Sequence, residues 1–586
     1  MNNDSRRDRI ASAVMVAIVA IAPLLPTLRA AYVYDDTTII RDNVLLRGWG
    51  ALARVWTQPY WPVEGVDALG LYRPVHVALL AFVWNVTGGA PVWLHAYALV
   101  LSAASALAVW WMLRRGAGAG AALVATAWFA MHPLHVEAIA SIANTSELLM
   151  VLCTIALVAV LVRMPATPDI PARDWKRAAL IGALAAAALG AKESGLLSLP
   201  IAAVTAGGWA EPRSDGARAF LRRNMRAWMA AAVGIAIVIF ARLVVLGAPV
   251  SHGSIAAQGI GAMSTGDRVA AMVSLWPRIA GMLVWPAALS PYYGPTIFPV
   301  NPAGVAVLSA VTMLALSGLA LVVARRGERR PLVALAWIAL TYLPASNLIT
   351  PTGQILADRT LFGATVGVAL AIAWMLDRLP SFGRRVAMAV IVLVAMRGAF
   401  TGATYAVAWT NHRALWTRLM ETSPNEHLSY KLLGMDARAR GENVRAVELL
   451  SRAFAMAPKD RQIRFELGQA QYSTHQYLAS VKTFAPLLTD ADARGEREFV
   501  ALYLDASGRA GGPEAVVHAA TPLLHSETAP TAALFLGVAL EQLGRGAEAD
   551  SVYALGLLRA PGDSALLSRR AHLDDRTKAK GKGQPS

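Results

Sequence analysis

Long apolar stretches recur through the first 410 residues of this chain of 586, and they constrain its fold more than any other feature. A helix of about 20 apolar residues can cross the roughly 30 Å hydrocarbon core of a bilayer. Hydrophobic residues make up 56% of the chain and charged residues 16%, which excludes a soluble enzyme of ordinary composition. We therefore predict an all-α fold in which residues 1–410 form a polytopic membrane bundle of about 11 transmembrane helices.

The apolar stretches differ in how well each fits a membrane crossing. The segment 71–86 is short and begins beside Arg73 and Pro74, so we expect it to enter the membrane without crossing. The first stretch also resembles a cleaved signal peptide, because its start is basic and small residues stand at Ala30 and Ala31. Both interpretations place the residues after Ala31 on the outer side. The expected crossings are residues 10–31, 93–113, 119–138, 148–162, 178–191, 196–209, 227–246, 303–324, 332–348, 361–375 and 386–409.

Basic residues lie between the apolar stretches rather than along one surface stripe, so the net charge of +16 does not indicate nucleic-acid binding. Short positively charged loops stay in the cytoplasm, and these clusters share one side only if residues 71–86 do not cross. The pattern predicts a multi-pass protein of a bacterial-type inner membrane whose residues beyond Trp409 are periplasmic. The clusters are Arg6, Arg7 and Arg9; Arg114 and Arg115; Arg173, Lys176 and Arg177; Arg213, Arg218, Arg222, Arg223 and Arg226; Arg325, Arg326, Arg329 and Arg330; and Arg378, Arg384 and Arg385.

The composition after Asn411 changes to mixed charged and apolar residues at helical spacing, with signs of a repeat. Gly434 and Gly468 are 34 residues apart, and Gly537 follows 69 residues later, which is two such periods plus one residue. This period predicts tetratricopeptide repeats, in which small residues let the two helices of a hairpin approach; hairpins without that fold are the alternative. The expected segments are a linker at 411–426, about four repeats at 427–563 and a basic, mostly disordered tail at 564–586.

Two adjacent carboxylates, Asp35 and Asp36, stand in the segment YVYDDTTII just beyond the first apolar stretch. Neighbouring carboxylates at a membrane surface repel each other and add little to folding, which favours a role as base or ligand. The alternative is a helix N-cap or a solvated loop, where Asp is common.

The segment MHPLHVEA brings His132, His135 and Glu137 to the outer end of an apolar stretch. The spacing of three between the histidines is that of two metal ligands on one helical face, yet Pro133 interrupts the helix and no third ligand is evident. We therefore expect no metal here, and favour a polar network that orders the outer loops and contacts the substrate.

Cations near the outer membrane surface are further candidates, because charge at that depth is costly. Lys192 could hold a phosphate as a point charge, or form a structural ion pair with Glu193 beside it. Arg73 in LYRPVH and Arg359 in ILADRTLFG suit bidentate phosphate binding, with a bridge to Asp358 or another carboxylate as the alternative. Carboxylates and cations together indicate an outward cavity for a lipid-phosphate substrate.

These motifs stand in an order that resembles a known family. YDD, LYRP, HPLHVEA, AKE, WPAALSPYY, LPASNL and ADR follow one another between Tyr34 and Arg359, and the repeats continue to about Pro561. The chain thereby resembles the TMTC-type proteins, which are transmembrane and tetratricopeptide-repeat O-mannosyltransferases of the GT-C superfamily of glycosyltransferases. Tyr292-Tyr293 departs from the pattern, since an acidic residue is expected before the tyrosine.

The resemblance implies an inverting glycosyltransferase that takes mannose or another hexose from a polyprenyl-phosphate donor at the outer face of the membrane. The acceptor is a hydroxyl, on Ser or Thr of an exported protein or on a glycan, with the repeats as its presenting surface. The acidic pair then carries catalysis, with Asp35 as base and Asp36 orienting acceptor or donor. Lys192, Arg73 and Arg359 would bind the departing phosphate. No cofactor is implied beyond this donor.

Two other functions fit the same residues. A membrane-anchored scaffold would use the repeats to recruit envelope proteins, and its charged residues would be dispensable. A ligase or polymerase of lipid-diphosphate glycans would share the outer site and the repeats. The chain has no GxGxxG or Walker pattern, and its single cysteine, Cys153, excludes an internal disulfide and a Cys-based zinc site.

Overall fold

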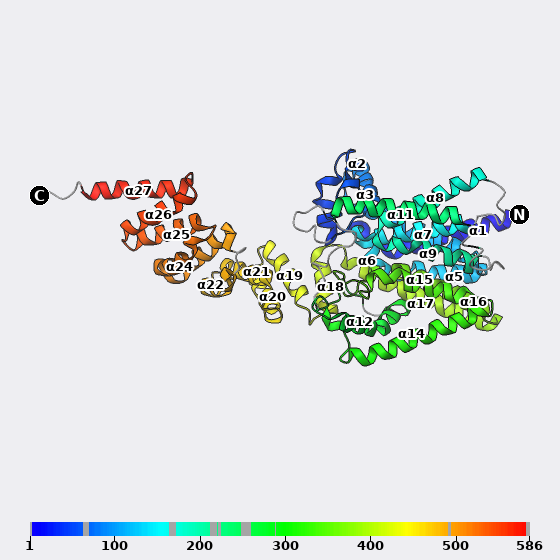
Figure 1. Ribbon diagram of the computed structural model, residues 1–586. Helices are drawn as coiled ribbons and strands as arrows, with labels where there is room; N and C mark the ends of the chain where they lie inside the picture. The colour runs from blue at the N-terminus through cyan, green and yellow to red at the C-terminus, as the bar shows by residue number, and fades with distance from the viewer. Residues whose placement is uncertain are drawn as a thin grey trace. The chain divides into compact units, whose positions relative to one another are not determined.

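The computed structural model of the chain describes residues 3–61, 70–162, 171–210, 220, 224–247, 259–286, 289–489 and 494–581. Every regular element in these ranges is a helix, which confirms the predicted all-α class. The chain divides into two compact units, Met1–Ser423 and Pro424–Ser586, each with its own helices (Figure 1). Part of one predicted basic cluster, Arg213, Arg218, Arg222 and Arg223, lies outside the described residues.

Seven helical segments in the described ranges are long and apolar enough to cross a membrane. They coincide with seven of the expected crossings and make the first unit a multi-pass helical bundle. The segments are α1 Asn3–Ile21 continued by η1 Ala22–Arg29, α4 Pro91–Leu113, η6 Ile142–Asn144 with α7 Ser146–Val162, α11 Met225–Leu246, α14 Pro302–Arg325, η11 Asp358–Leu361 with α16 Phe362–Arg378, and α17 Ser381–Ala408.

The other expected crossings fall on helices that are shorter or begin with charged residues. The stretch 119–138 forms two helices that are separated near Pro133. Proline has no backbone N–H to donate to the preceding turn, so it interrupts a helix. Helix α3 has 14 residues, or about 21 Å at 1.5 Å per residue, which fits a segment that does not cross. These and the remaining helices of the unit are α2 Ala51–Arg54, α3 Pro74–Thr87, α5 Ala119–Ala130, α6 His135–Ala140, α8 Pro171–Ala191, α9 Ser198–Thr205, α12 Thr265–Ser274, α13 Trp276–Val284 and α15 Arg330–Tyr342.

The segment after η1 folds back as a cap of short helical turns against α3. Ile39 and Ile40, in the turn η2 Thr37–Arg41, are buried in one hydrophobic cluster with Leu80 of α3 and Ile142 of η6. Burial of such side chains contributes roughly 1.5–3 kcal/mol each, so the cap is firmly held. The acidic pair precedes η2 directly and is therefore fixed beside η6.

The predicted linker at 411–426 is wrong for most of its length. Residues His412–Thr422 form helix α18, which belongs to the first unit. Its apolar side chains Leu415, Trp416 and Leu419 are buried, with 0%, 6% and 0% of their surface exposed. Mixed composition suggested a spacer, but three apolar residues spaced along one helix are enough to dock it.

The second unit consists of helical hairpins of the size expected for tetratricopeptide repeats. Helices pair as α19 with α20 and α21 with α22, α24 bends at Gly512 (φ 73°), and α25 pairs with α26 before α27 ends the unit. The bounds are α19 His427–Ala439, α20 Asn443–Met456, α21 Arg461–Ser473, α22 Tyr477–Phe484, α24 Arg497–Ala520, α25 Ala529–Gln542, α26 Gly546–Arg559 and α27 Ser564–Gly581.

The glycines that mark the period lie at the crossing of each hairpin. A Cβ atom at Gly434 would come within 2.6 Å of Leu450, one at Gly468 within 2.3 Å of Phe484, and one at Gly537 within 2.2 Å of Tyr553. In each hairpin the large partner follows the glycine by 16 residues. The repeat is therefore a packing repeat, in which a missing side chain on one helix accommodates a bulky one on the next.

The intervening hairpin reverses this arrangement. Tyr503 occupies the glycine position, and Ala519, 16 residues later, occupies the bulky one. Both are buried in the hydrophobic cluster of this unit. The exchange conserves volume at the crossing, which explains why this repeat is hard to recognise from its sequence.

The predicted disordered tail is helical through most of its length. Helix α27 runs from Ser564 to Gly581, and Leu566 and Leu573 pack against the cluster of the preceding helices. Packing of these two leucines fixes the helix, which the basic composition did not suggest. Residues 582–586 lie outside the described residues.

The crossing at Gly468 provides a test of the packing repeat. We expect Gly468→Ala to destabilise the second unit by about 1–3 kcal/mol, because its methyl group would overlap the Phe484 ring. Gly546→Ala is the matched control, since the nearest atom to its Cβ is 3.8 Å away. Thermal unfolding with limited proteolysis of the full chain measures both. Equal stability of the two variants would contradict the packing repeat.

Candidate active site

Asp36 anchors the cap of short helical turns to the membrane bundle. Its carboxylate accepts the backbone N–H groups of Ile142 at 3.0 Å and Ala143 at 2.8 Å, and the Ser141 hydroxyl at 3.3 Å. The side chain is 1% exposed. Burial raises the pKa of the Asp36 carboxyl to about 7, although the two N–H donors oppose this shift. With its oxygens engaged by η6, Asp36 serves as a positioning residue.

The backbone conformation of Tyr34 orients the turn that carries Asp35 and Asp36. Its φ of 58° lies in the left-handed region, which costs a residue with a side chain about 1–2 kcal/mol. The Tyr34 carbonyl accepts the Thr37 hydroxyl at 2.7 Å, which closes the turn around Asp35 and Asp36. Such a strained backbone conformation persists only where surrounding contacts hold the residue in place.

Asp35 differs from its neighbour in that its carboxylate has no hydrogen bond or ion pair within the described part of the chain. Burial raises the pKa of Asp35; the charges of Arg359 and Arg73 lower it, and the charge of Glu137 raises it. The side chain remains partly exposed. Asp35 is thus the carboxylate that is available to a substrate.

The charge of Arg359 acts on Asp35, and its guanidinium is held by Glu137. The guanidinium pairs with one carboxylate oxygen of Glu137, and the Arg359 backbone N–H donates to the other at 2.9 Å. Glu137 is fully buried. The alternative of a bridge from Arg359 to a carboxylate is therefore observed, with Glu137 as the partner, while Asp358 accepts the Tyr293 hydroxyl at 2.6 Å. The pairing leaves Nε and Nη2 of Arg359 without a carboxylate partner.

Arg73 lies in a second charged group. Its Nε and Nη2 donate to Glu193 at 3.0 and 2.8 Å, and its guanidinium stacks 4.8 Å from the Tyr60 ring centroid. Arg242 of α11 approaches the other oxygen of Glu193 at 3.7 Å. Sequence reasoning missed Arg242, although an arginine within an apolar helix is a functional signal by itself.

Lys192 is the third cation of the site, and its carboxylate partner is not the neighbouring Glu193. It pairs with Glu147 at the start of α7, and Glu193 pairs with Arg73, so the alternative of an ion pair between Lys192 and Glu193 does not hold. The side chains of Lys192 and Glu193 point apart because the backbone of Lys192 is extended (φ −158°) ahead of the turn that starts at Glu193. The side chain of Lys192 is 13% exposed, similar to Arg73 and Arg359 at 12% and 13%.

The two histidines lie among aromatic side chains rather than with the carboxylates. His135 donates to or accepts from the Thr365 hydroxyl at 2.9 Å, and its ring lies 4.6 Å from Phe129 and 4.4 Å from Phe362. Within the described residues no group of three or more His, Cys, Asp or Glu side chains could hold a metal ion. The histidine pair therefore acts in helix packing around the site.

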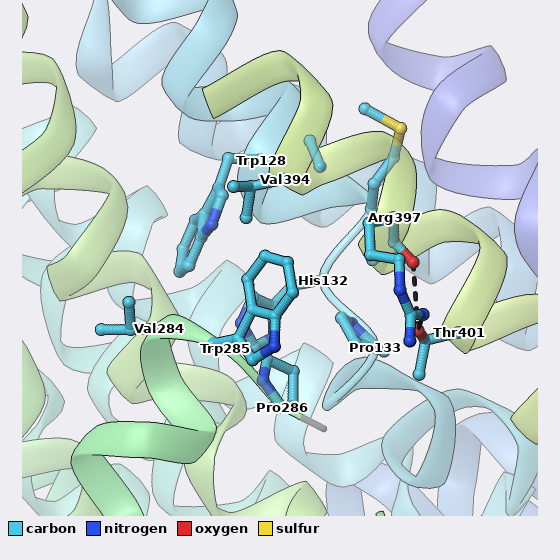
Figure 2. Close-up of a pocket in the computed structure, with 12 residues that line it drawn as sticks. Trp128, His132, Pro133, Val284, Trp285, Pro286, Val394, Arg397 and Thr401 are labelled. Atoms are coloured by element: carbon cyan, nitrogen blue, oxygen red, sulfur yellow. Dashed lines mark hydrogen bonds between the residues drawn. The ribbon is translucent and has the colours of Figure 1, made fainter. Parts of the chain in front are cut away.

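His132 borders a small cavity of about 20 Å³, room for about one water molecule. Figure 2 shows this pocket with Trp128, Trp285 and Pro133 around it, and Arg397 bonded to Thr401 at its edge. Neither ring nitrogen of His132 has a hydrogen-bond partner within the described part of the chain. The enclosed space beside His132 is therefore smaller than a sugar ring.

The fold and the site define a polytopic helical membrane protein in which Asp35, unbonded within the described ranges, is under the influence of paired cations. No family model matches the chain. It is similar to three proteins of Drosophila melanogaster described as protein O-mannosyl-transferases. Tmtc3 is 21% identical over 535 residues, covering 80% of this chain and 58% of Tmtc3. Tmtc2 is 30% identical over 31% of this chain, and Tmtc1 is 29% identical over 30%.

These comparisons confirm the resemblance to the TMTC-type proteins. The chain spans 58% of the length of Tmtc3, and the matches to Tmtc2 and Tmtc1 cover 20% of each. The similarity extends through most of the present chain and therefore includes both the membrane bundle and part of the repeats.

The two aspartates should respond differently to substitution. We expect Asp36→Ala to destabilise the first unit by about 1–3 kcal/mol, because it leaves two buried N–H groups unsatisfied. Asp35→Ala is the matched comparison and should leave stability unchanged, since it removes no bond. Thermal unfolding of the full chain in lipid nanodiscs measures the difference. A similar loss for both variants would contradict the assignment.

Proposed function

We propose that the protein is a membrane glycosyltransferase that uses Asp35 as its catalytic base. One observation carries the proposal: Asp35 is a partly exposed carboxylate that has no bonded partner among the described residues and is under the influence of Arg359 and Arg73. A carboxylate in such surroundings can accept a proton from a hydroxyl and return to its charged form. The similarity to O-mannosyl-transferases supports transfer of a sugar, with mannose or another hexose as the group transferred.

The donor in this proposal is a sugar on a polyprenyl phosphate. As the acceptor oxygen forms its bond to the anomeric carbon, the bond from that carbon to the phosphate oxygen breaks, and the configuration inverts. The hydroxyl proton moves to Asp35, and the electron pair of the broken bond leaves with the lipid phosphate. Negative charge on the phosphate is then stabilised by cations already fixed in the site.

The cations suit this role because their glutamate partners orient them without using all their donors. Within the described residues, Arg73 uses Nε and Nη2 on Glu193, Arg359 pairs with Glu137 through Nη1, and Lys192 uses one of its three N–H donors on Glu147. A buried cation without a counter-ion would cost several kcal/mol, so the pairs also keep the empty site stable. We infer that the phosphate binds across these three side chains.

The reaction side and the acceptor belong to the same proposal. The distribution of basic loops supports an outward-facing site in a bacterial-type inner membrane. A Ser or Thr hydroxyl of an exported protein is the proposed acceptor, and the helical repeats of the second unit are its proposed docking surface.

The central test is Asp35→Asn. We expect transfer from a polyprenyl-phosphate hexose to fall by about 100-fold or more, because the amide cannot accept the proton. Asp42→Asn, at an exposed aspartate of the same segment, should retain activity. The assay compares monophosphate and diphosphate donors with purified protein in nanodiscs.

Each outcome of this assay separates the proposed reaction from another function. Activity on the diphosphate donor alone would indicate a glycan ligase or polymerase. Full activity of Asp35→Asn would exclude Asp35 as base. A wild-type chain without transfer from either donor would favour a scaffold.

The charge of Arg73 should set the pH at which Asp35 becomes active. Asp35 must be ionised to accept a proton, so the rate falls as pH falls through its pKa. Arg73 lowers that pKa, as Arg359 does more strongly, so Arg73→Gln should raise it and move the acidic limb of the rate profile to higher pH. Arg73→Lys keeps the charge and should leave the limb in position. Profiles of kcat against pH decide; an unmoved limb in Arg73→Gln contradicts the arrangement.

A further inference from the structure

Helix α18 contacts the turn around Asp35 and Asp36 in the first unit. The chain leaves α17 through Thr410, whose carbonyl accepts the Ala31 N–H at 3.0 Å, and α18 starts after an N-cap in which Asn411 accepts the Ala414 N–H at 2.9 Å. At its other end, the Thr422 hydroxyl donates to the Ser290 hydroxyl at 2.8 Å. The helix is thus fixed at both ends within this unit.

Two residues on one face of α18 hold Tyr34. The Nε2 atom of His412 accepts the Tyr34 backbone N–H at 3.2 Å. Trp416, one helical turn later, packs edge-on against the Tyr34 ring with centroids 5.5 Å apart. Tyr34 is the residue with the left-handed backbone, so α18 supplies the contacts that keep this conformation.

Asp35 therefore lies between two anchored neighbours. Tyr34 is held by α18 on one side, and Asp36 is held by η6 on the other. Asp35 itself makes no bond within the described residues that would fix its direction. The orientation of the Asp35 carboxylate is therefore set by the backbone of the turn, and that backbone is held by both anchors.

We propose that His412 is a positioning residue for Asp35, which it orients by accepting the Tyr34 N–H. The inference rests on the proposed function, because Asp35 is the base there. His412 does not touch the substrate and transfers no proton. Its contribution is to hold the turn so that the Asp35 carboxylate faces the acceptor hydroxyl, a matter of geometry to which catalysis is sensitive.

The test compares His412→Leu, which removes the acceptor, with His412→Gln, whose amide oxygen restores one. Hydrogen–deuterium exchange of the full chain in nanodiscs measures protection of the Tyr34 amide. We expect faster exchange in His412→Leu and near wild-type exchange in His412→Gln. For transfer, we expect kcat of His412→Leu to fall 10-fold or more with the KM for the donor within 3-fold, and His412→Gln to recover most of kcat.

His518→Leu is the matched control, because it makes the same exchange at an exposed helical position of the second unit. It should leave both the Tyr34 amide and kcat unchanged. Unchanged exchange in His412→Leu would overturn the anchor, and faster exchange with unchanged kcat would overturn the positioning role. A wild-type protein without transfer activity would instead refute the proposed function, while the exchange comparison would still decide whether His412 holds the turn.

Discussion

The site depends on the bonds between the Asp36 carboxylate and the backbone N–H groups of η6. They join the cap after the first membrane segment to the start of α7, two parts of the chain more than 100 residues apart. A buried carboxylate is tolerated only with such donors, and removal of either partner would leave an uncompensated group. This one connection keeps Asp36 occupied and leaves Asp35, one residue earlier, free.

Charge pairing explains the rest of the site. Arg359, Arg73 and Lys192 each lie next to a glutamate from a different part of the chain, and all three are largely shielded from solvent. In a low-dielectric environment a lone cation is costly, whereas a paired one with spare donors is stable and still able to bind an anion. The site therefore combines a carboxylate without a partner with cations that have one.

The sequence predicted several parts of this arrangement correctly because their signals are local. Apolar length predicted eleven membrane crossings, seven of which coincide with long apolar helices in the described ranges, and the 34-residue spacing of Gly434 and Gly468 predicted hairpins whose crossings the structure confirms. Sequence-based prediction failed where the interacting residues are far apart in the sequence. Lys192 and Glu193 are adjacent yet pair with Glu147 and Arg73, and residues 412–422 read as a linker although Leu415 and Leu419 dock them against the bundle.

The sequence by itself determined the class of the protein: its membrane segments, its repeats and the residues from which a site could be built, since helix length and periodicity are properties of neighbouring residues. Only the tertiary structure decided which of two adjacent aspartates is free, which glutamate holds each cation, and that α18 supports Tyr34. Those outcomes depend on burial and on contacts between residues up to 378 positions apart, and no local pattern encodes them.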